Sequence, residues 1–263
     1  MTQDNWAAGA AYEPYVGRWS RLVAQDFVKW LSIADNRSWL DVGCGTGALS
    51  QAILSAAAPR SLVGIDSSEG FLAHARQTIH DARVRFEVAD AQVIPLDASS
   101  CDVAVSGLVL NFVPEPTLML GEMARVVRQG GTIAVYVWDY AGEMQLMRHF
   151  WDAVVALDPS AKPRDEAIRF PICQPEPLTK LFQDVRLADI RLLPITVSTH
   201  FHDFDDYWNP FLSGQGPAPT YVTSLDDSHR NTLRDYIHEQ LPVQDDGTIP
   251  LSARAWAVRA TRS

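Results

Sequence analysis

The 263-residue sequence is long enough for one large α/β domain, or for one domain with a sizeable insertion. Its 22 basic and 32 acidic side chains give a formal net charge of −10, so we expect no nucleic-acid partner. The N-terminus lacks a basic segment followed by an apolar one, and no apolar run approaches the ~20 residues that span a bilayer. Three cysteines predict no disulfide framework. These features favour a cytoplasmic globular protein without a membrane span.

Residues 1–36 are expected to form an N-terminal cap segment whose helix lies over a sheet. Residues 37–139 then alternate short apolar runs with helical patterns. The expected strands are 39–42, 61–65, 84–88, 102–106 and 132–137, and the expected helices are 48–57, 69–79 and 117–127. Gly130 and Gly131 are read as the stop of the last helix. This alternation predicts a doubly wound, mostly parallel sheet.

The pattern changes after Tyr140. Residues 140–178 carry an amphipathic helix (143–157) and a proline-rich stretch, and we expect them to form a lid insert. Residues 179–263 are expected to complete the sheet and the acceptor pocket. Their elements are a short helix at 178–182, β runs at 185–193 and 195–201, a helix at 225–241 and a strand at 253–260.

The strongest local signal is the glycine-rich sequence from Leu40 to Gly47, between the first expected strand and helix. Glycines allow a sharp turn and a close approach of a ligand to the backbone, and the next helix directs free N–H groups at the same place. In an open α/β sheet such a loop lies where ligands bind. Because Gly43-x-Gly45-x-x-Ala48 also satisfies the dinucleotide fingerprint, an NAD(P)-dependent oxidoreductase is an alternative at this point.

Several further segments resemble the class I S-adenosylmethionine-dependent methyltransferases, and residues 11–20 resemble the N-terminal segment of their small-molecule, quinone-methyltransferase-like group. The matching segments, in family order, are Asp41-x-Gly43-x-Gly45-x-Gly47, 63–68 with 71–75, 88–96, 102–106 and 124–131. The resemblance implies a seven-stranded Rossmann-like sheet over a single domain, 1–263, whose last strand lies antiparallel between the fifth and the sixth. It also implies S-adenosylmethionine as cofactor and S-adenosylhomocysteine as product.

The family's binding residues transfer to this sequence position by position. Asp66 is expected to hold the ribose hydroxyls, Asp90 to accept from the adenine amino group, and Arg18 to pair with the cofactor carboxylate. An acidic pocket favours the cationic sulfur, whereas Asp41 would repel a pyrophosphate. The full set of expected cofactor-binding residues is Arg18, Asp41, Gly43, Cys44, Gly45, Asp66, Ser67, Phe71, Asp90, Ala91, Gln92, Gly107, Asn111 and Phe112.

The acceptor is expected to be a small molecule, apolar or aromatic in character. Residues 110–114 depart from the Asn/Asp-Pro-Pro-Tyr/Phe pattern of enzymes that methylate exocyclic and protein amides. Aromatic side chains gather in the segments that surround the methyl group in this fold. The acceptor residues we expect are Tyr12, Tyr15, Trp138, Tyr140 and Trp208.

No general base is identified, and no metal site is expected. His149, His200, His202 and Asp139 are the candidate bases, but each is more often structural. Methyl transfer is an in-line displacement that needs a base only for a protonated nucleophile. A cofactor-binding protein without turnover is therefore the second alternative. The sequence leaves the methylated atom, the pathway and the oligomeric state open.

Overall fold

The computed structural model describes residues 16–214 and 216–263. The expected acceptor residues Tyr12 and Tyr15 lie outside them. The chain divides into two compact units. We call residues 20–137, 172–195 and 255–263 the core unit, and the described parts of 1–19, 138–171 and 196–254 the second unit. Among the described residues, no helix is long and apolar enough to cross a membrane.

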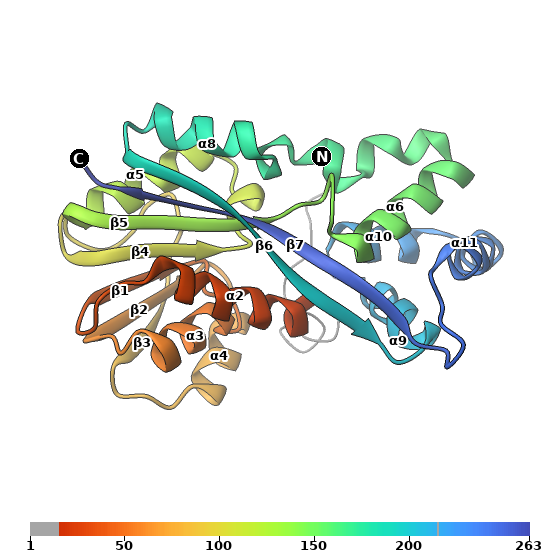
Figure 1. Cartoon of the computed structure of the whole chain (residues 1–263), viewed down its shortest axis with the longest axis horizontal. Coiled ribbons are helices and arrows are strands. Elements are labelled where there is room, and N and C mark those ends of the chain that lie inside the picture. The colour runs from red at the N-terminus through yellow and green to blue at the C-terminus, as the bar shows by residue number, and fades with distance from the viewer. Residues whose placement is uncertain (1–15, 215) are drawn as a thin grey trace. The chain divides into compact units, whose positions relative to one another are not determined.

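A seven-stranded sheet has the order β3-β2-β1-β4-β5-β7-β6 (Figure 1). The first five strands pair in parallel, through β1–β2, β1–β4, β2–β3 and β4–β5. Strand β7 lies between β5 and β6, as expected. Its antiparallel direction follows from the hydrogen bonds Gly130 N to Arg262 O and Asp139 N to Arg254 O. The strands are β1 (Ser38–Val42), β2 (Ser61–Asp66), β3 (Val84–Val88), β4 (Cys101–Gly107), β5 (Val127–Trp138), β6 (Ala188–Phe201) and β7 (Ile249–Thr261).

Helices cover both faces of the sheet in the core unit. Figure 1 shows α3 and α4 on one face, and α5 and α8 on the other. Helix α2 packs against the sheet through Phe27, whose ring centroid lies 4.7 Å from that of Tyr136 on β5. The helices are α2 (Arg18–Leu31), α3 (Ala48–Ala56), α4 (Glu69–Thr78), the 3-10 turn η2 (Leu110–Phe112), α5 (Pro116–Val126), the 3-10 turn η4 (Pro171–Cys173) and α8 (Pro175–Asp184).

Two sequence expectations are wrong in detail. Gly130 and Gly131 lie inside β5, where the pairing with β4 is irregular between Cys101 and Val103, rather than ending the preceding helix. A glycine at such a bulge tolerates the positive φ that Gly130 has. The two β runs on either side of Pro194 form one continuous strand, β6. Proline is tolerated there because β6 is an edge strand.

The second unit is mostly helical and is built on an aromatic core. The rings of Phe150 and Phe211 stack with centroids 4.6 Å apart, and Tyr207 donates a hydrogen bond to the Leu146 carbonyl. Buried acids are paired: Asp165 accepts from Arg148, and Glu166 accepts from the indole of Trp151. Its helices are α6 (Gln145–Leu157), η3 (Pro159–Arg164), α7 (Glu166–Arg169), α9 (Phe204–Trp208), η5 (Asn209–Ser213), α10 (Pro217–Ser224) and α11 (Asp227–Gln240).

Candidate cofactor site

The glycine-rich loop connects the carboxyl end of β1 to α3. Gly43, Gly45 and Gly47 all have positive φ, with values of 70°, 55° and 91°. At Gly43 an added Cβ would lie 2.6 Å from the side chain of Val109, which follows β4. The loops after β1 and β4 therefore touch at a distance that only glycine allows. Both Gly43 N and Cys44 N donate to the carbonyl of Ile65 on β2, which fixes the loop beside that strand.

Asp41 is fully buried at the end of β1. Its Oδ2 accepts a 2.7 Å hydrogen bond from the hydroxyl of Ser50 on α3. Burial raises the pKa of Asp41 to about 7, and the nearby Asp66 carboxylate adds to that effect. The side chain thus links the strand to the helix behind the glycine loop, and its charge is finely balanced near neutral pH.

Asp66 ends β2 and connects two loops. Its Oδ2 accepts from the backbone N of Gly45 at 2.9 Å, and its Oδ1 accepts from Ser68 N at 2.8 Å. Burial raises the pKa of this carboxyl group. Each oxygen has a second acceptor position, so the carboxylate can take further hydrogen bonds from ligand hydroxyls. Ser67 follows it on the surface, and Phe71 lies half-buried in the first turn of α4.

The segment after β3 carries the third acidic residue. The exposed Asp90 accepts from the backbone N of Gln92 at 2.8 Å, and Gln92 Oε1 in turn accepts from Glu115 N at 3.1 Å. These bonds hold the turn at Ala91 against the start of α5. Because β3, β2 and β1 are parallel neighbours, Asp90, Asp66 and Asp41 all lie at or just beyond the carboxyl ends of their strands, on the same side of the sheet.

Strand β4 ends at the same edge in an unusual conformation. Leu108 has a φ of 63°, which is rare for a bulky residue and is typical of functional sites. The preceding Gly107 leaves room for Tyr136, whose hydroxyl would lie 2.4 Å from an added Cβ. Asn111 is buried in η2, and Phe112 is half-buried beside it. Sequence reasoning missed Leu108 and Tyr136, because neither a backbone angle nor a cross-strand contact is visible in a single sequence.

Three buried polar atoms near this edge have no hydrogen-bond partner within the described part of the chain. They are Asp41 Oδ1, Ser106 Oγ and Asn111 Nδ2. Buried polar groups are normally paired, so each is suited to a polar ligand that supplies the missing partner. Acceptors at Asp66 and Asp90 suit the donors of an adenosine, and a clustered negative charge suits a cationic sulfur. The residues therefore fit S-adenosylmethionine.

A family model described as a methyltransferase domain matches residues 40–135. Over these residues the chain carries a methyltransferase domain, in agreement with its resemblance to the class I S-adenosylmethionine-dependent methyltransferases. The matched segment runs from the end of β1 into β5 and so contains the glycine loop, Asp66, Asp90 and the β4 turn.

Individual relatives agree with this family. The demethylmenaquinone methyltransferase of Shouchella clausii is 33% identical over 113 residues, which are 41% of this chain and 48% of that protein. The chain thus spans less than half the length of the curated relatives it matches first.

Among solved structures, the YcgJ protein of Bacillus subtilis has a TM-score of 0.58 at 17% identity, covering 93% of this chain and 98% of that one. Haemonchus contortus phosphoethanolamine N-methyltransferase 2, in complex with phosphomonomethylethanolamine and S-adenosylhomocysteine, has a TM-score of 0.59 at 16% identity. That match covers 96% of this chain and 56% of the other. At these identities the structures share the methyltransferase fold with this chain.

Arg18 has a carboxylate partner within the second unit. Its Nη1 donates to Asp206 Oδ1 at 2.9 Å, and its guanidinium lies 4.5 Å from the Trp19 ring and 4.8 Å from that of Phe201. Its Nε is buried without a hydrogen-bond partner among the described residues. The expected pairing with the cofactor carboxylate stays a prediction.

The described acceptor candidates are buried in the second unit. Trp138 is 3% exposed, Tyr140 packs at 5.9 Å from Phe170, and Trp208 packs between Phe204 and Phe211. Their role in acceptor binding stays a prediction.

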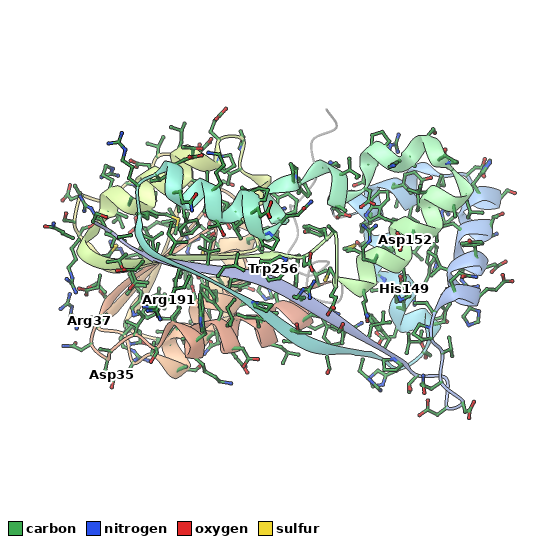
Figure 2. All side chains as sticks on the ribbon, turned by 45° about the horizontal axis from the view of Figure 1, so that its top comes forward. Asp35, Arg37, His149, Asp152, Arg191 and Trp256 are labelled. Carbon is green, nitrogen blue, oxygen red and sulfur yellow. The ribbon has the colours of Figure 1, made fainter. Side chains whose placement is uncertain are left out.

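The candidate bases differ in their surroundings. Asp139 is bound to Arg254, whereas His200 and His202 lie on the surface. His149 lies beside Asp152 on α6 (Figure 2), and its partial burial lowers its pKa. Burial raises the pKa of Cys44 well above its usual range, so this loop thiol stays protonated and is a poor nucleophile.

Proposed function

We propose that the chain transfers a methyl group from S-adenosylmethionine to a small-molecule oxygen, nitrogen or carbon nucleophile. The observation that carries this proposal is the arrangement of Asp41, Asp66 and Asp90 at the carboxyl ends of β1, β2 and β3, which we call the acidic edge. Asp66 accepts a hydrogen bond from the glycine loop, and Asp41 lies buried behind that loop. The match to a methyltransferase domain supports methyl transfer, and the small-molecule acceptor is supported by relatives such as the demethylmenaquinone methyltransferase.

The cofactor, when bound, supplies a methyl group on a cationic sulfur. Asp66 would hold the ribose hydroxyls, because its two oxygens are already fixed in orientation by Gly45 N and Ser68 N. Asp90 would accept from the adenine amino group, and the glycine backbone would lie along the amino-acid portion. The protein's main contribution is then orientation: a displacement in line with the departing sulfur depends on positioning more than on proton transfer.

The acceptor pocket is proposed to use the aromatic residues of the second unit. Trp138 and Tyr140 directly follow the matched domain in sequence, and Trp208 ends α9. An acceptor with an apolar or aromatic body would pack against such rings.

Calorimetric titration tests the cofactor assignment directly. S-adenosylmethionine and S-adenosylhomocysteine should bind at micromolar Kd to the full chain, and Asp66→Ala should weaken both about tenfold or more, because two ribose hydrogen bonds to a charged group are lost. The matched control is Asp184→Ala, which removes an exposed aspartate on α8. Binding of NADH or NADPH alone would show that the loop's ligand is a dinucleotide. Formation of S-adenosylhomocysteine with any acceptor separates an enzyme from a binding protein.

A further inference from the structure

Arginines lie at the amino ends of the core strands, opposite to the carboxyl ends where the glycine loop is found. Arg37 immediately precedes β1, Arg60 immediately precedes β2, and Arg128 is the second residue of β5. The parallel register pairs Ser38 with Ser61, so Arg37 and Arg60 stand on adjacent strand starts, about 4.8 Å apart in the sheet. Figure 2 shows Arg37 beside Asp35. We call Arg37, Arg60 and Arg128 the arginine row.

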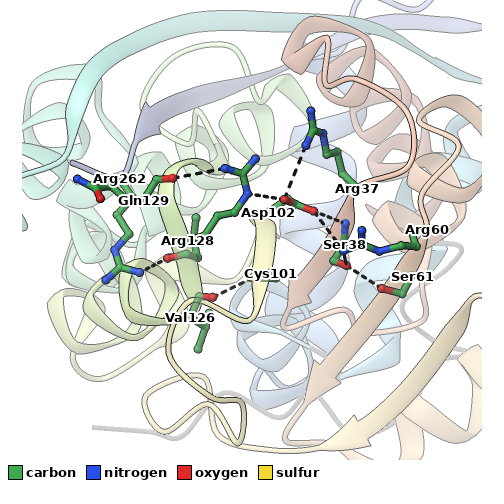
Figure 3. Close-up of polar contacts among 11 residues, drawn as sticks. Arg37, Ser38, Arg60, Ser61, Cys101, Asp102, Val126, Arg128, Gln129 and Arg262 are labelled. Carbon is green, nitrogen blue, oxygen red and sulfur yellow. Dashed lines mark hydrogen bonds and ion pairs between the residues drawn. The ribbon is translucent and has the colours of Figure 1, made fainter.

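The three arginines converge on the carboxylate of Asp102 (Figure 3). Arg128 Nε donates to its Oδ1 at 2.5 Å, Arg37 Nη1 lies 3.9 Å from the same oxygen, and Arg60 Nη2 lies 3.7 Å from Oδ2. Oδ2 also accepts from the backbone N of Ser38 at 2.8 Å. Both carboxylate oxygens are thus occupied by closer donors than Arg37 or Arg60.

The row therefore carries excess positive charge. Three guanidinium groups face the Asp102 carboxylate, and with the exposed Asp35 beside Arg37 counted as well, one positive charge stays unmatched on a chain whose formal net charge is −10. Arg83 immediately precedes β3 but is paired with Asp81. Arg262 donates to the Ser99 hydroxyl and to a backbone carbonyl. We therefore count neither of them in the row.

Hydrogen-bond donors in the row remain available to a ligand. Within the described chain the Arg37 guanidinium makes no hydrogen bond, and Arg60 donates to the Ser38 hydroxyl. The side chains of Arg37, Arg60 and Arg128 are 42%, 60% and 45% exposed, whereas that of Asp102 is 12% exposed. Arg37 and Arg60 thus keep guanidinium N–H groups that Asp102 does not bind, and a guanidinium fork matches an oxyanion, which can accept two parallel N–H bonds from it.

We propose that the arginine row binds a phosphate-class oxyanion at the amino ends of the strands, opposite to the cofactor loop at their carboxyl ends. Arg37 and Arg60 supply the donors that Asp102 leaves unused, and Arg128 is held by Asp102 at the side of the site. This site is independent of the proposed methyl transfer, since none of its residues belongs to the glycine loop or to the acidic edge.

Inorganic phosphate is the probe for the first experiment. Thermal unfolding and calorimetric titration of the full chain, at constant ionic strength set with chloride, should give saturable binding. Constant ionic strength matters because exposed charges are screened over about 10 Å at 0.1 M salt. The double variant Arg37→Gln/Arg60→Gln should raise the Kd about tenfold or more, as expected for the loss of charge-assisted bonds.

Matched variants separate a site from general charge. Arg76→Gln removes an equally exposed arginine that is paired with Glu69 on α4, and it should leave the phosphate Kd unchanged. Asp102→Asn removes the opposing charge while keeping an acceptor for Ser38 N, so it should bind phosphate severalfold more tightly. Non-saturable binding, an equal effect of Arg76→Gln, or weaker binding by Asp102→Asn would each overturn the proposal.

The source of the phosphate group can be distinguished in the same samples. Co-sedimentation with phosphatidylglycerol vesicles, lost in the double variant and absent with phosphatidylcholine, would assign the site to a lipid headgroup. Phosphate binding without co-sedimentation would assign it to a free anion. Both outcomes require the arginine row, and binding of S-adenosylhomocysteine should be the same in all variants.

Discussion

The two carboxylates at the ends of β1 and β2, Asp41 and Asp66, differ in how the protein holds them. Asp66 is held by the backbone of two loops, whereas Asp41 is bound by one hydroxyl and keeps a buried oxygen without a protein partner in the described chain. The sequence motif predicted both residues. It could not predict that they differ in this way, because burial and partners arise from the packing of α3 on the sheet.

Asp41 should make the stability of the free protein depend on pH. An exposed aspartate in the unfolded chain has a pKa of about 3.9, and burial raises the folded-state pKa of Asp41 to about 7. Between these values the folded state holds a proton that the unfolded state has lost. The contribution of Asp41 to the free energy of unfolding therefore falls as pH rises from about 4 to about 7, by at most ~1.4 kcal/mol per pH unit.

Denaturant unfolding of wild type and Asp41→Asn across that range measures this contribution. Asparagine does not titrate, so the stability of wild type relative to the variant should decline with rising pH and level off above pH 7. A stability difference between wild type and variant that stays constant across the range would show that Asp41 has the same protonation state in the folded and the unfolded protein.

Arg18 can be tested for its role at the cofactor against its role in the second unit. If it pairs with the cofactor carboxylate, Arg18→Gln should raise the Kd of S-adenosylhomocysteine about tenfold, because a charged hydrogen bond is lost. Asp206→Asn is the matched variant, since it weakens the Arg18–Asp206 pair and keeps the arginine. Calorimetry that gives equal, small changes for both variants would restrict Arg18 to pairing with Asp206.

At the scale of elements, an ion pair joins the end of β5 to β7. Asp139 Oδ2 accepts from Arg254 Nε at 2.8 Å and from Glu143 N at 3.0 Å, and the Asp139 side chain is 5% exposed. A buried charge that loses its partner is costly, usually by 3–5 kcal/mol. The Asp139–Arg254 pair therefore contributes more to the free energy of unfolding than an exposed ion pair would.

Arg254→Met should lower the free energy of unfolding by about 3 kcal/mol in chemical denaturation, since it leaves Asp139 buried and unpaired. The double variant Asp139→Asn/Arg254→Met should recover part of that loss. Lys180→Ala removes one partner of an exposed pair on α8 and should cost less than about 1 kcal/mol. Equal losses for Arg254→Met and Lys180→Ala would contradict this account.

The elements that sequence reasoning placed well are those with a local signal. The core strands and α3, α4 and α5 were predicted within a few residues, because apolar period and glycine turns determine them. Pro194 and the Gly130–Gly131 pair were misjudged, since both residues usually interrupt an element. Their tolerance depends on an edge position and on a bulge, which are properties of the assembled sheet.

On the scale of the whole molecule, the cofactor and acceptor residues fall in different compact units. All the expected cofactor residues except Arg18 lie in the core unit, and Trp138, Tyr140 and Trp208 lie in the second. The cofactor set stays a prediction, and it rests on contiguous motifs that a large family shares. The aromatic set had no comparable motif, and the structure places much of it in a hydrophobic core.

This division predicts that acceptor and cofactor binding can be changed separately. Trp138→Phe and Tyr140→Leu, which retain apolar volume, should raise the KM for an acceptor several-fold while the Kd of S-adenosylhomocysteine changes less than twofold. Asp66→Ala should show the opposite pattern. Steady-state kinetics with any acceptor found by screening, together with calorimetry, measures both, and equal loss of both affinities would count against the acceptor role.

Proline 194 has a consequence for how copies of this chain meet in solution. Strands β6 and β3 are the two open edges of the sheet, and open edges invite backbone pairing with another chain. Pro194 removes one N–H donor from the middle of β6, and on β3 the exposed Arg85 and Glu87 place charges along the other edge. Both edges thus carry features by which natural sheets resist strand addition, and so protect a concentrated protein against aggregation.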